Sequence, residues 1–596
     1  MKTFLRVLLH WTLVGTIGHV LFLMVYHNTI GEISWGDCCK VLLHALKLDI
    51  AIAAYLTIIP AVMLIIGTKW KGMRIMWNGY YVIFSAIYAL ANIANIGLYG
   101  QWEFPLDYTP ILYLRTSLTD AMASITITQM TLSALGIALL TYGTFITRPL
   151  YAYIGKYNRI ATALFTVALI LPIRGGTDTG TNHTGAVYFS DNMKLNHAAV
   201  NPVFCFMEST AHQTNFAEQY RFMTDEEANK EITLLNAETD STETDLRDSL
   251  FTTQPKRIIL VVLEGFSTLL MEKSGRVKGV TPCLEQLCDD GVYFTNFYAS
   301  SWRTDRALLS ILSGLPASPT MSLIDQPKKS NTLPSIARTL TRNGWNTTFY
   351  YGGDTGFSNM QSYLMATGFQ HIVSDKDFPR DMRTGKWGVP DGPIFESVEH
   401  SLRHTDKREF IAIMTLSSHE PFDVPHKSQF KDARLNAFHY TDSCLGRFIR
   451  TLQSRQDWGE TLVAIVPDHK GAYPDDIGIS DTLRYLQPLL MTGGIVKRSV
   501  CIPRLGGQTD IAATLLSLLR LDYTDFPFSH SLLMARQPRY AFLSFPDGMG
   551  LKDANGYVWH DNVTARILQS EGNNTERQVH RARAYLQKVY DYMNKL

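Results

Sequence analysis

The first 175 residues carry five long apolar runs, and these runs constrain the fold more than any other feature of the sequence. They cover residues 8–26, 50–67, 77–98, 121–146 and 160–173. A helix needs about 20 apolar residues to cross the hydrocarbon core of a membrane. The first four runs reach or approach that length, and four such runs in one third of a chain do not fit the buried helices of a soluble protein. We therefore expect an N-terminal transmembrane domain of about five helices at residues 1–175.

Basic residues flank alternate ends of these runs and predict the orientation of the helices. The positive-inside rule places such clusters in the cytoplasm, and five crossings then put everything after residue 175 outside the cytoplasmic membrane. No small-residue cleavage site follows residues 8–26, so we expect this run to stay as a helix. The basic residues that carry this argument are Lys2, Arg6, Lys69, Lys71, Arg74, Arg148, Lys156 and Arg159.

The remaining residues have the pattern of a soluble α/β protein. Residues 176–255 are rich in Asn, Thr and Asp and predict a linker that partly packs on the next domain. We expect a catalytic domain at residues 256–540, with residues 541–596 as its C-terminal extension. Lys and Arg total 55 and Asp and Glu total 54, so the net charge gives no indication of a nucleic-acid partner. The seven cysteines form no C-x-x-C pair, which leaves a zinc ribbon unsupported.

Three short runs of apolar, mostly β-branched residues predict buried parallel strands. They cover Arg257–Leu263 (RIILVVL), residues 410–416 (FIAIMTL) and residues 461–466 (TLVAIV). Helical patterns lie between or beside them, and strands alternating with helices favour a doubly wound, mainly parallel sheet. In such sheets the chemistry lies beyond the carboxyl ends of the strands. The helical patterns cover residues 332–343, 391–403 and 436–453.

Polar residues with metal-ligand chemistry follow each of these strands. Glu264 follows the first strand, His419 follows the second, and Asp468 and His469 follow the third. Each residue alone is more commonly a helix cap or a solvated loop residue. Their joint placement after three strands predicts a site for one divalent cation, because two carboxylates and an imidazole suit Zn²⁺ or Mn²⁺.

Thr304 opens an apolar helical pattern that runs to Ser313. A hydroxyl at a helix start faces free backbone N–H groups and the positive end of the helix dipole, which is an anion-binding position. An activated hydroxyl there can attack phosphorus. Threonine is also a good helix cap, and the pattern alone does not separate the two interpretations.

Four motifs in this order resemble the catalytic domain of lipoteichoic acid synthases and phosphoethanolamine transferases, within the alkaline phosphatase/sulfatase superfamily. They are E-G at residues 264–265, R-T-D-R-A-L-L-S-I-L-S-G at 303–314, L-S-S-H-E-P-F at 416–422 and P-D-H-K-G at 467–471. The five apolar runs and residues 194–209 are similar to the same family, so the resemblance covers most of the chain. It implies an alkaline phosphatase-like α/β domain on a bacterial membrane anchor.

The resemblance also implies roles for individual residues. Glu264, Thr304, Asp468 and His469 would hold one divalent metal ion (Mn²⁺, Zn²⁺ or Mg²⁺), and Thr304 would attack the phosphodiester of a phospholipid head group. His419 would contact the transferring phosphate or protonate a leaving oxygen. Trp302, Arg303, Arg306 and Asn359 would line the head-group pocket.

The chain departs from the family in two places. Lipoteichoic acid synthases carry a Trp-x-Arg pair that contacts glycerol phosphate, whereas this chain has Phe357-Ser358-Asn359. True sulfatases need a Cys or Ser followed by x-Pro-x-Arg, and Cys283 and Cys288 lack that continuation. The first departure leaves the identity of the head group open, and the second disfavours a sulfatase in the strict sense.

The favoured function is metal-dependent transfer of phosphoglycerol or phosphoethanolamine from a membrane phospholipid to a glycan or glycolipid, through a phospho-threonine intermediate. A second interpretation is an extracytoplasmic phosphodiesterase or phosphatase, which uses water as the acceptor with the same nucleophile and metal. A third is a membrane scaffold with a relic site, against which the complete set of Glu264, Thr304, Asp468 and His469 argues.

Overall fold

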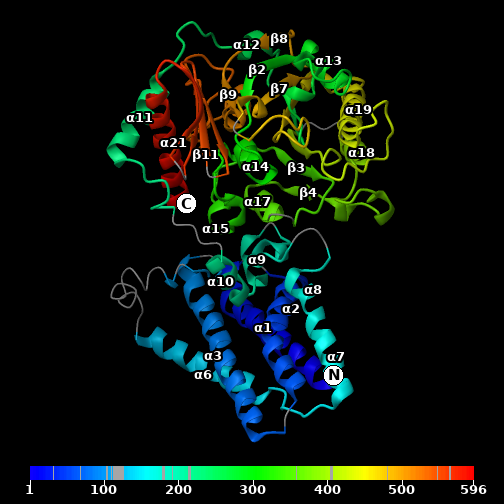
Figure 1. Cartoon of the computed structure of the whole chain (residues 1–596), viewed down its shortest axis with the longest axis vertical. Helices are drawn as coiled ribbons and strands as arrows, with labels where there is room; N and C mark the ends of the chain where they lie inside the picture. Colours follow the sequence, from blue (N-terminus) through cyan, green and yellow to red (C-terminus); the bar gives the residue numbers. More distant parts are fainter. Residues whose placement is uncertain are drawn as a thin grey trace. The chain divides into compact units, whose positions relative to one another are not determined.

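The structure is a computed structural model and separates into two compact units, residues 1–214 and 215–596 (Figure 1). The residues that it describes are 1–30, 33–67, 69–102, 105–108, 110–111, 127–177, 181–190, 192–211, 216–356, 359–402, 407–479, 481–546, 548–562 and 565–596. The expected linker, residues 176–255, is divided between the two units, which are described in turn.

Four helices of the first unit are long and apolar enough to cross a membrane. They are α1 (Lys2–Ile30), α2 (Trp35–Ile66), α3 (Lys71–Trp102) and α6 (Ile127–Ile146). Four of the five expected apolar runs therefore lie on helices of this kind, although residues 121–126 of the fourth run lie outside the described residues. Many large apolar side chains on these helices face outward, as a lipid environment requires.

The fifth expected span is not a single long helix. Residues 160–173 are divided between α7 (Lys156–Ala168) and α8 (Ile170–Arg174), and neither is long enough to cross a membrane alone. Pro172 supplies the physical reason, because a proline ring clashes with the carbonyl four residues earlier, here Ala168, where α7 ends. Within the described residues, four helices rather than five meet the length of a span.

A buried polar cluster joins α1, α2 and α3 to the segment that follows α8. The imidazole of His19 contacts Asp49 Oδ1 at 3.0 Å and the carbonyl of Ala198 at 2.7 Å. Asn201 donates to Asp49 Oδ1 at 2.8 Å and to the Tyr88 hydroxyl at 2.7 Å. All of these side chains are buried, and ionisable groups inside membrane helices need such partners. The cluster therefore fixes α9 (Met193–Ala199) and α10 (Pro202–Ala211) to the helix bundle.

The second unit contains a nine-stranded sheet with the order β4-β3-β5-β1-β6-β7-β2-β8, and β9 also pairs with β2. The strands β1, β3, β4, β5 and β6 are parallel, whereas β7 runs antiparallel to both of its neighbours. The expected mainly parallel sheet is confirmed, with β7 as the exception. The strands are β1 (Arg257–Leu263), β2 (Val292–Tyr298), β3 (Asn346–Tyr351), β4 (His371–Val373), β5 (Glu409–Met414), β6 (Thr461–Pro467), β7 (Leu486–Thr492), β8 (Val500–Ile502) and β9 (Gly506–Gly507).

Helices cover both faces of this sheet (Figure 1). Alternate residues of β1 explain why: Ile258 packs with one set of helices, whereas Ile259 packs with the other. A strand that is apolar at every position is buried on both sides. One face carries α13 (Pro282–Asp290), α18 (Asp391–Ser401) and α19 (Ala433–Gln453), and the other carries α14 (Thr304–Ser313), α16 (Ile336–Arg342) and α20 (Ile511–Leu518).

Residues 541–596 form a small antiparallel sheet and the last helix. The order is β10-β11-β12-β13, and α21 (Thr575–Lys595) packs against β11 and β12. The sheet meets the larger one where Ser544 N donates to the carbonyl of Ser300 at 2.9 Å. Its strands are β10 (Ala541–Phe545), β11 (Gly548–Asp553), β12 (Gly556–Asp561) and β13 (Ile567–Gly572).

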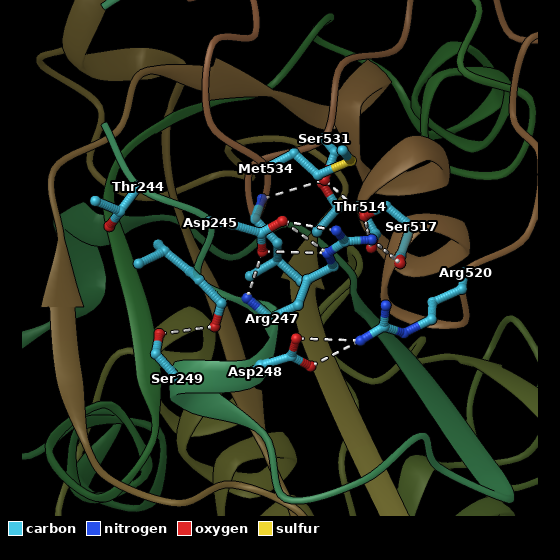
Figure 2. A network of polar contacts seen from close by, with 12 residues as sticks. Thr244, Asp245, Arg247, Asp248, Ser249, Thr514, Ser517, Arg520, Ser531 and Met534 are labelled. Atoms are coloured by element: carbon cyan, nitrogen blue, oxygen red, sulfur yellow. Dashed lines mark hydrogen bonds and ion pairs between the residues drawn. The ribbon is translucent and has the colours of Figure 1, made fainter. Parts of the chain in front are cut away.

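The acidic segment before β1 is ordered against the second unit. It forms α11 (Asp225–Ala237), whose first turn is closed by a capping box between Thr224 and Glu227. Further along, Arg247 lies between Asp245 and the carbonyl of Ser517, and Arg520 pairs with Asp248 (Figure 2). Arg539 also binds Glu243 at 2.6 Å, with both side chains about one-tenth exposed. These contacts hold residues 224–250 against the rest of the second unit.

A buried carboxylate caps α13 from a neighbouring helix and gives a pH prediction. Asp442 of α19 accepts from the backbone N–H groups of Cys283 at 2.9 Å and Leu284 at 2.8 Å. Burial nevertheless raises its pKa from 3.8 to about 6. A raised pKa in the folded state gives stability that is present at low pH and lost as pH rises through that pKa, here about 2–3 kcal/mol between pH 4 and pH 7.

The measurement is the thermal midpoint of the detergent-solubilised chain against pH, for the natural chain and for Asp442→Asn. Because asparagine carries no proton that titrates in this range, we expect the variant to gain a few degrees relative to the natural chain between pH 4 and pH 7. Parallel curves for the two proteins would contradict the assignment of this titration to Asp442.

Candidate active site and metal centre

Three of the four residues expected as metal ligands follow two adjacent strands of the sheet. Glu264 comes directly after β1, and Asp468 and His469 come directly after β6. Their ligand atoms all lie within 4.8 Å of one another. Because β1 and β6 are parallel neighbours in register from Arg257 to Leu263, their carboxyl ends carry these side chains to the same point. The structure therefore brings these three predicted ligands together.

Thr304 lies directly against this set. Its hydroxyl oxygen is 3.2 Å from Glu264 Oε2 and 3.2 Å from His469 Nε2. Thr304 is the first residue of α14, and Arg303 occupies the N-cap position. The helix start directs free N–H groups and a partial positive charge to the space beside the hydroxyl, which favours a phosphate there.

The electrostatics of the cluster are those of a cation site. Burial, and then the nearby charge of Asp468, raise the pKa of Glu264 well above its usual value. Asp468 is fully buried; its Oδ1 accepts from the backbone N–H groups of Gly265 and His469, whereas Oδ2 has no hydrogen-bond partner among the described residues. A buried carboxylate oxygen without a donor is costly. A divalent cation would satisfy it and relieve the repulsion between the two acids.

His469 is oriented for ligation by its other ring nitrogen. Nδ1 lies 3.0 Å from the carbonyl of Lys470, which can only accept, so Nδ1 carries the proton. Nε2 then presents its lone pair 3.7 Å from Glu264 Oε1 and 3.4 Å from Asp468 Oδ2. A hydrogen bond that fixes the tautomer in this way is typical of metal-binding histidines.

Residues after β5 hold the backbone of the Glu264 loop. Thr415 accepts from Glu264 N at 2.9 Å, and Ser418 donates to the carbonyl of Glu264 at 2.6 Å. Asp391, at the start of α18, accepts from Leu416 N at 2.7 Å and thereby fixes the loop after β5 that carries Thr415 and Ser418. The sequence interpretation missed these supporting roles, and the hydroxyl residues that directly follow a buried strand were the available signal.

His419 lies in this loop, next to Trp387. The two rings meet edge to face with centroids 4.7 Å apart, and His419 Nδ1 lies 3.0 Å from the carbonyl of Glu420. His419 is not part of the converging ligand set found among the described residues. It remains predicted as a residue that contacts the phosphate or protonates a leaving oxygen.

The residues expected to line a head-group pocket differ in their surroundings. Arg303 is exposed, whereas Arg306 is buried, donates to the carbonyl of Ser318 at 3.1 Å and lies 4.8 Å from the ring of Trp302. Asn359 is buried and donates to the carbonyl of Ile324 at 2.9 Å. Phe357 and Ser358 lie outside the described residues. Roles for Trp302, Arg303, Arg306 and Asn359 in substrate binding remain predictions.

Comparison with known proteins gives a family match for part of the second unit. The family model described as Sulfatase matches residues 256–521. Residues 256–521 are therefore similar to the Sulfatase family, and the fold of the second unit is alkaline phosphatase-like, as the solved structures described below indicate. Enzymes of this superfamily use a divalent metal, which agrees with the ligand set.

Individual relatives give a more specific comparison than the family model. The chain is 24% identical over 314 residues to lipoteichoic acid synthase 2 of Bacillus subtilis, covering 48% of each chain, and 24% identical over 334 residues to phosphoglycerol transferase I of Xanthomonas campestris, covering 50% of this chain and 46% of the relative. It spans about half the length of these curated relatives.

Two solved structures share the fold. An alkaline phosphatase superfamily protein of Vibrio parahaemolyticus matches with a TM-score of 0.54 and 23% identity, covering 62% of this chain and 97% of that one. A lipoteichoic acid synthase of Listeria monocytogenes matches with a TM-score of 0.51 and 20% identity, covering 62% and 98%. The chain thus resembles the lipoteichoic acid synthases, as the sequence motifs predict, and also a phosphoglycerol transferase.

The orphaned oxygen of Asp468 predicts the effect of removing its charge. Asp468→Asn keeps an acceptor for the N–H groups of Gly265 and His469 but removes a carboxylate from the ligand set. We expect the affinity for Mn²⁺ to fall by about 100-fold or more, because a hard cation needs the negative charge. The measurement is Mn²⁺ titration of the chelator-treated full chain by electron paramagnetic resonance. Asp442→Asn, a buried acid outside the site, is the matched control, and an equal loss there would contradict the assignment.

Proposed function

We propose that this protein transfers a phosphoryl-linked head group, phosphoglycerol or phosphoethanolamine, from a membrane phospholipid to a glycan or glycolipid acceptor. The observation that carries the proposal is the position of the Thr304 hydroxyl, 3.2 Å from both Glu264 and His469 at the start of α14. A nucleophile with this environment suits phosphoryl transfer. The names of the relatives, lipoteichoic acid synthase and phosphoglycerol transferase, support the same reaction class.

The proposed reaction has two displacements. In the first, Thr304 Oγ1 loses its proton to the Glu264 carboxylate and bonds to phosphorus, the bond to the diacylglycerol oxygen breaks, and that oxygen receives a proton, for which His419 is the proposed donor. In the second, an acceptor hydroxyl bonds to phosphorus, the bond to Thr304 Oγ1 breaks, Oγ1 recovers its proton from Glu264, and the acceptor proton returns to His419. The phosphoryl group thus moves through a phospho-threonine ester, and Thr304 is regenerated.

Different residues of the site activate the Thr304 hydroxyl and stabilise the negative charge on the phosphoryl oxygens. Thr304 donates to Glu264 Oε2, so this carboxylate is the proton acceptor nearest to the nucleophile. The first-turn N–H groups of α14 face the phosphoryl oxygens and stabilise their charge. Glu264, Thr304, Asp468 and His469 would hold one divalent ion (Mn²⁺, Zn²⁺ or Mg²⁺), which when bound supplies Lewis-acid stabilisation of developing negative charge.

We propose that α7 and α8 together form the fifth membrane crossing. They are separated by Leu169 alone, and residues 156–174 are consecutive in sequence and predominantly apolar. With this crossing, the basic residues between the second and third apolar runs, and those between the fourth and fifth, lie in the cytoplasm. The catalytic unit then lies outside the cytoplasmic membrane. There the site would meet outer-leaflet phospholipids and cell-envelope glycans.

Analysis of the products tests the function. The detergent-purified chain with Mn²⁺ would be incubated with phosphatidylglycerol or phosphatidylethanolamine, with and without a glycolipid acceptor, and both the lipid and the glycan products measured. Diacylglycerol release with transfer of one head group to the glycolipid is the expected result. Free glycerol phosphate or phosphoethanolamine at the same rate with and without acceptor would replace the transferase with a hydrolase that uses water.

A further inference from the structure

A glutamine remote from the reacting groups in sequence links the two halves of the site. Gln508 follows β9, whose glycines Gly506 and Gly507 pair with Phe297 and Tyr298 of β2. Its side chain is fully buried. None of the motifs that define the catalytic residues includes it.

All of the hydrogen bonds of the Gln508 side chain go to the backbone of the two active-site loops. Oε1 accepts from Ser300 N at 2.9 Å, and Nε2 donates to the carbonyls of Pro467 at 2.8 Å and Asp468 at 2.6 Å. An N–H can only donate and a carbonyl can only accept, so these partners fix which end of the amide is oxygen. Both amide hydrogens are used, and the side chain has a single orientation.

The two loops lack a direct sheet connection that would set their separation. Ser300 follows β2 and leads to Thr304, whereas Asp468 and His469 follow β6. In the sheet order, β7 lies between β6 and β2, so β2 and β6 share no ladder of hydrogen bonds. Gln508 spans this gap and joins the backbone four residues before Thr304 to the backbone of a predicted metal ligand.

We propose that Gln508 is a positioning residue, which sets the separation of the Thr304 loop from the Asp468–His469 loop. The proposal rests on the proposed function for the roles of these three residues. A site that holds its groups within about 0.5 Å of the productive geometry needs such support around it. Thr304 Oγ1 and His469 Nε2 are 3.2 Å apart. A small shift of either loop therefore changes both the metal site and the position of the nucleophile.

The chain offers a matched control for this proposal. Gln487 of β7 is also fully buried, and within the described part of the chain its amide nitrogen and oxygen have no hydrogen-bond partner. Gln487→Leu and Gln508→Leu make the same chemical change at the same burial. Only the second removes bonds to the two active-site loops. Gln508→Asn gives an intermediate case, because the shortened amide cannot reach both loops.

The test measures Mn²⁺ affinity and the kinetics of a soluble chromogenic phosphodiester on the full chain in detergent. For Gln508→Leu we expect about 10- to 100-fold weaker Mn²⁺ binding and a similar fall in kcat at saturating Mn²⁺, with KM changed by less than about 3-fold. Gln508→Asn should give a smaller loss of both, and Gln487→Leu should retain the values of the natural chain.

Two results would overturn the proposal. One is Mn²⁺ affinity and kcat within about 2-fold of the natural chain in a folded Gln508→Leu or Gln508→Asn protein. The other is an equal loss in Gln487→Leu, which would indicate a general effect of disturbing the core. The Mn²⁺ titration needs no substrate, so it stands even if head-group transfer is disproved. If Gln508→Leu fails to fold, Gln508→Asn decides the question alone.

Discussion

Thr304→Ala is expected to abolish turnover, with kcat reduced by at least about 1,000-fold. The hydroxyl oxygen is the only atom that could form the phospho-threonine ester, and alanine leaves no nucleophile at the start of α14. Glu264, Asp468 and His469 remain, and their ligand atoms converge without Thr304. We therefore expect Mn²⁺ still to bind, with about 10-fold lower affinity.

Intact mass spectrometry tests the role of Thr304 as the nucleophile, and Mn²⁺ titration by electron paramagnetic resonance tests the retained metal binding. The natural chain incubated with Mn²⁺ and mixed phospholipids should gain the mass of one head group, mapped to the peptide that contains Thr304, and Thr304→Ala should gain none. Thr304→Ser is the matched control, because it keeps a hydroxyl at the same helix position and should retain measurable turnover. Product formation by the alanine variant at the natural rate would remove Thr304 from the mechanism.

Three of the metal ligands could be predicted from the sequence because they directly follow buried strands. Short runs of β-branched residues such as Arg257–Leu263 favour buried strands, and the sheet order places β5, β1 and β6 side by side. Polar residues that directly follow them must then lie at one edge. The chemistry of Glu264, Asp468 and His469 could therefore be read before any geometry was known.

Other features could not be read in the same way. Gln508 acts through backbone groups of Ser300, Pro467 and Asp468, and backbone groups leave no trace in the residue types of a sequence. The break between α7 and α8 was visible as Pro172, but the count of apolar residues outweighed it. The antiparallel direction of β7 depends on the connection from β6 and not on its composition.

The membrane unit makes the second large prediction, at the contact between His19 and Asp49. His19→Leu removes one of the two donors to Asp49 Oδ1, and Asp49 Oδ2 already lacks a hydrogen-bond partner in the part of the chain that the structure describes. A buried carboxylate left with one donor is strongly destabilising. We expect a loss of about 3–5 kcal/mol, measured as a lower thermal midpoint in detergent and a lower yield of folded protein.

The double variant His19→Leu/Asp49→Leu separates a buried charge from simple loss of packing. Removing both partners leaves no uncompensated carboxylate, so the double variant should be more stable than His19→Leu alone. Gly15→Ala tests the same contact from another direction, because a Cβ there would lie 2.6 Å from Asp49 Oδ1 and displace the carboxylate. Additive losses for the two leucine substitutions would show that His19 and Asp49 act independently. Coupled losses would show that His19 and Asp49 stabilise the membrane helices as a pair, because the carboxylate of Asp49 is costly only when its imidazole partner is removed.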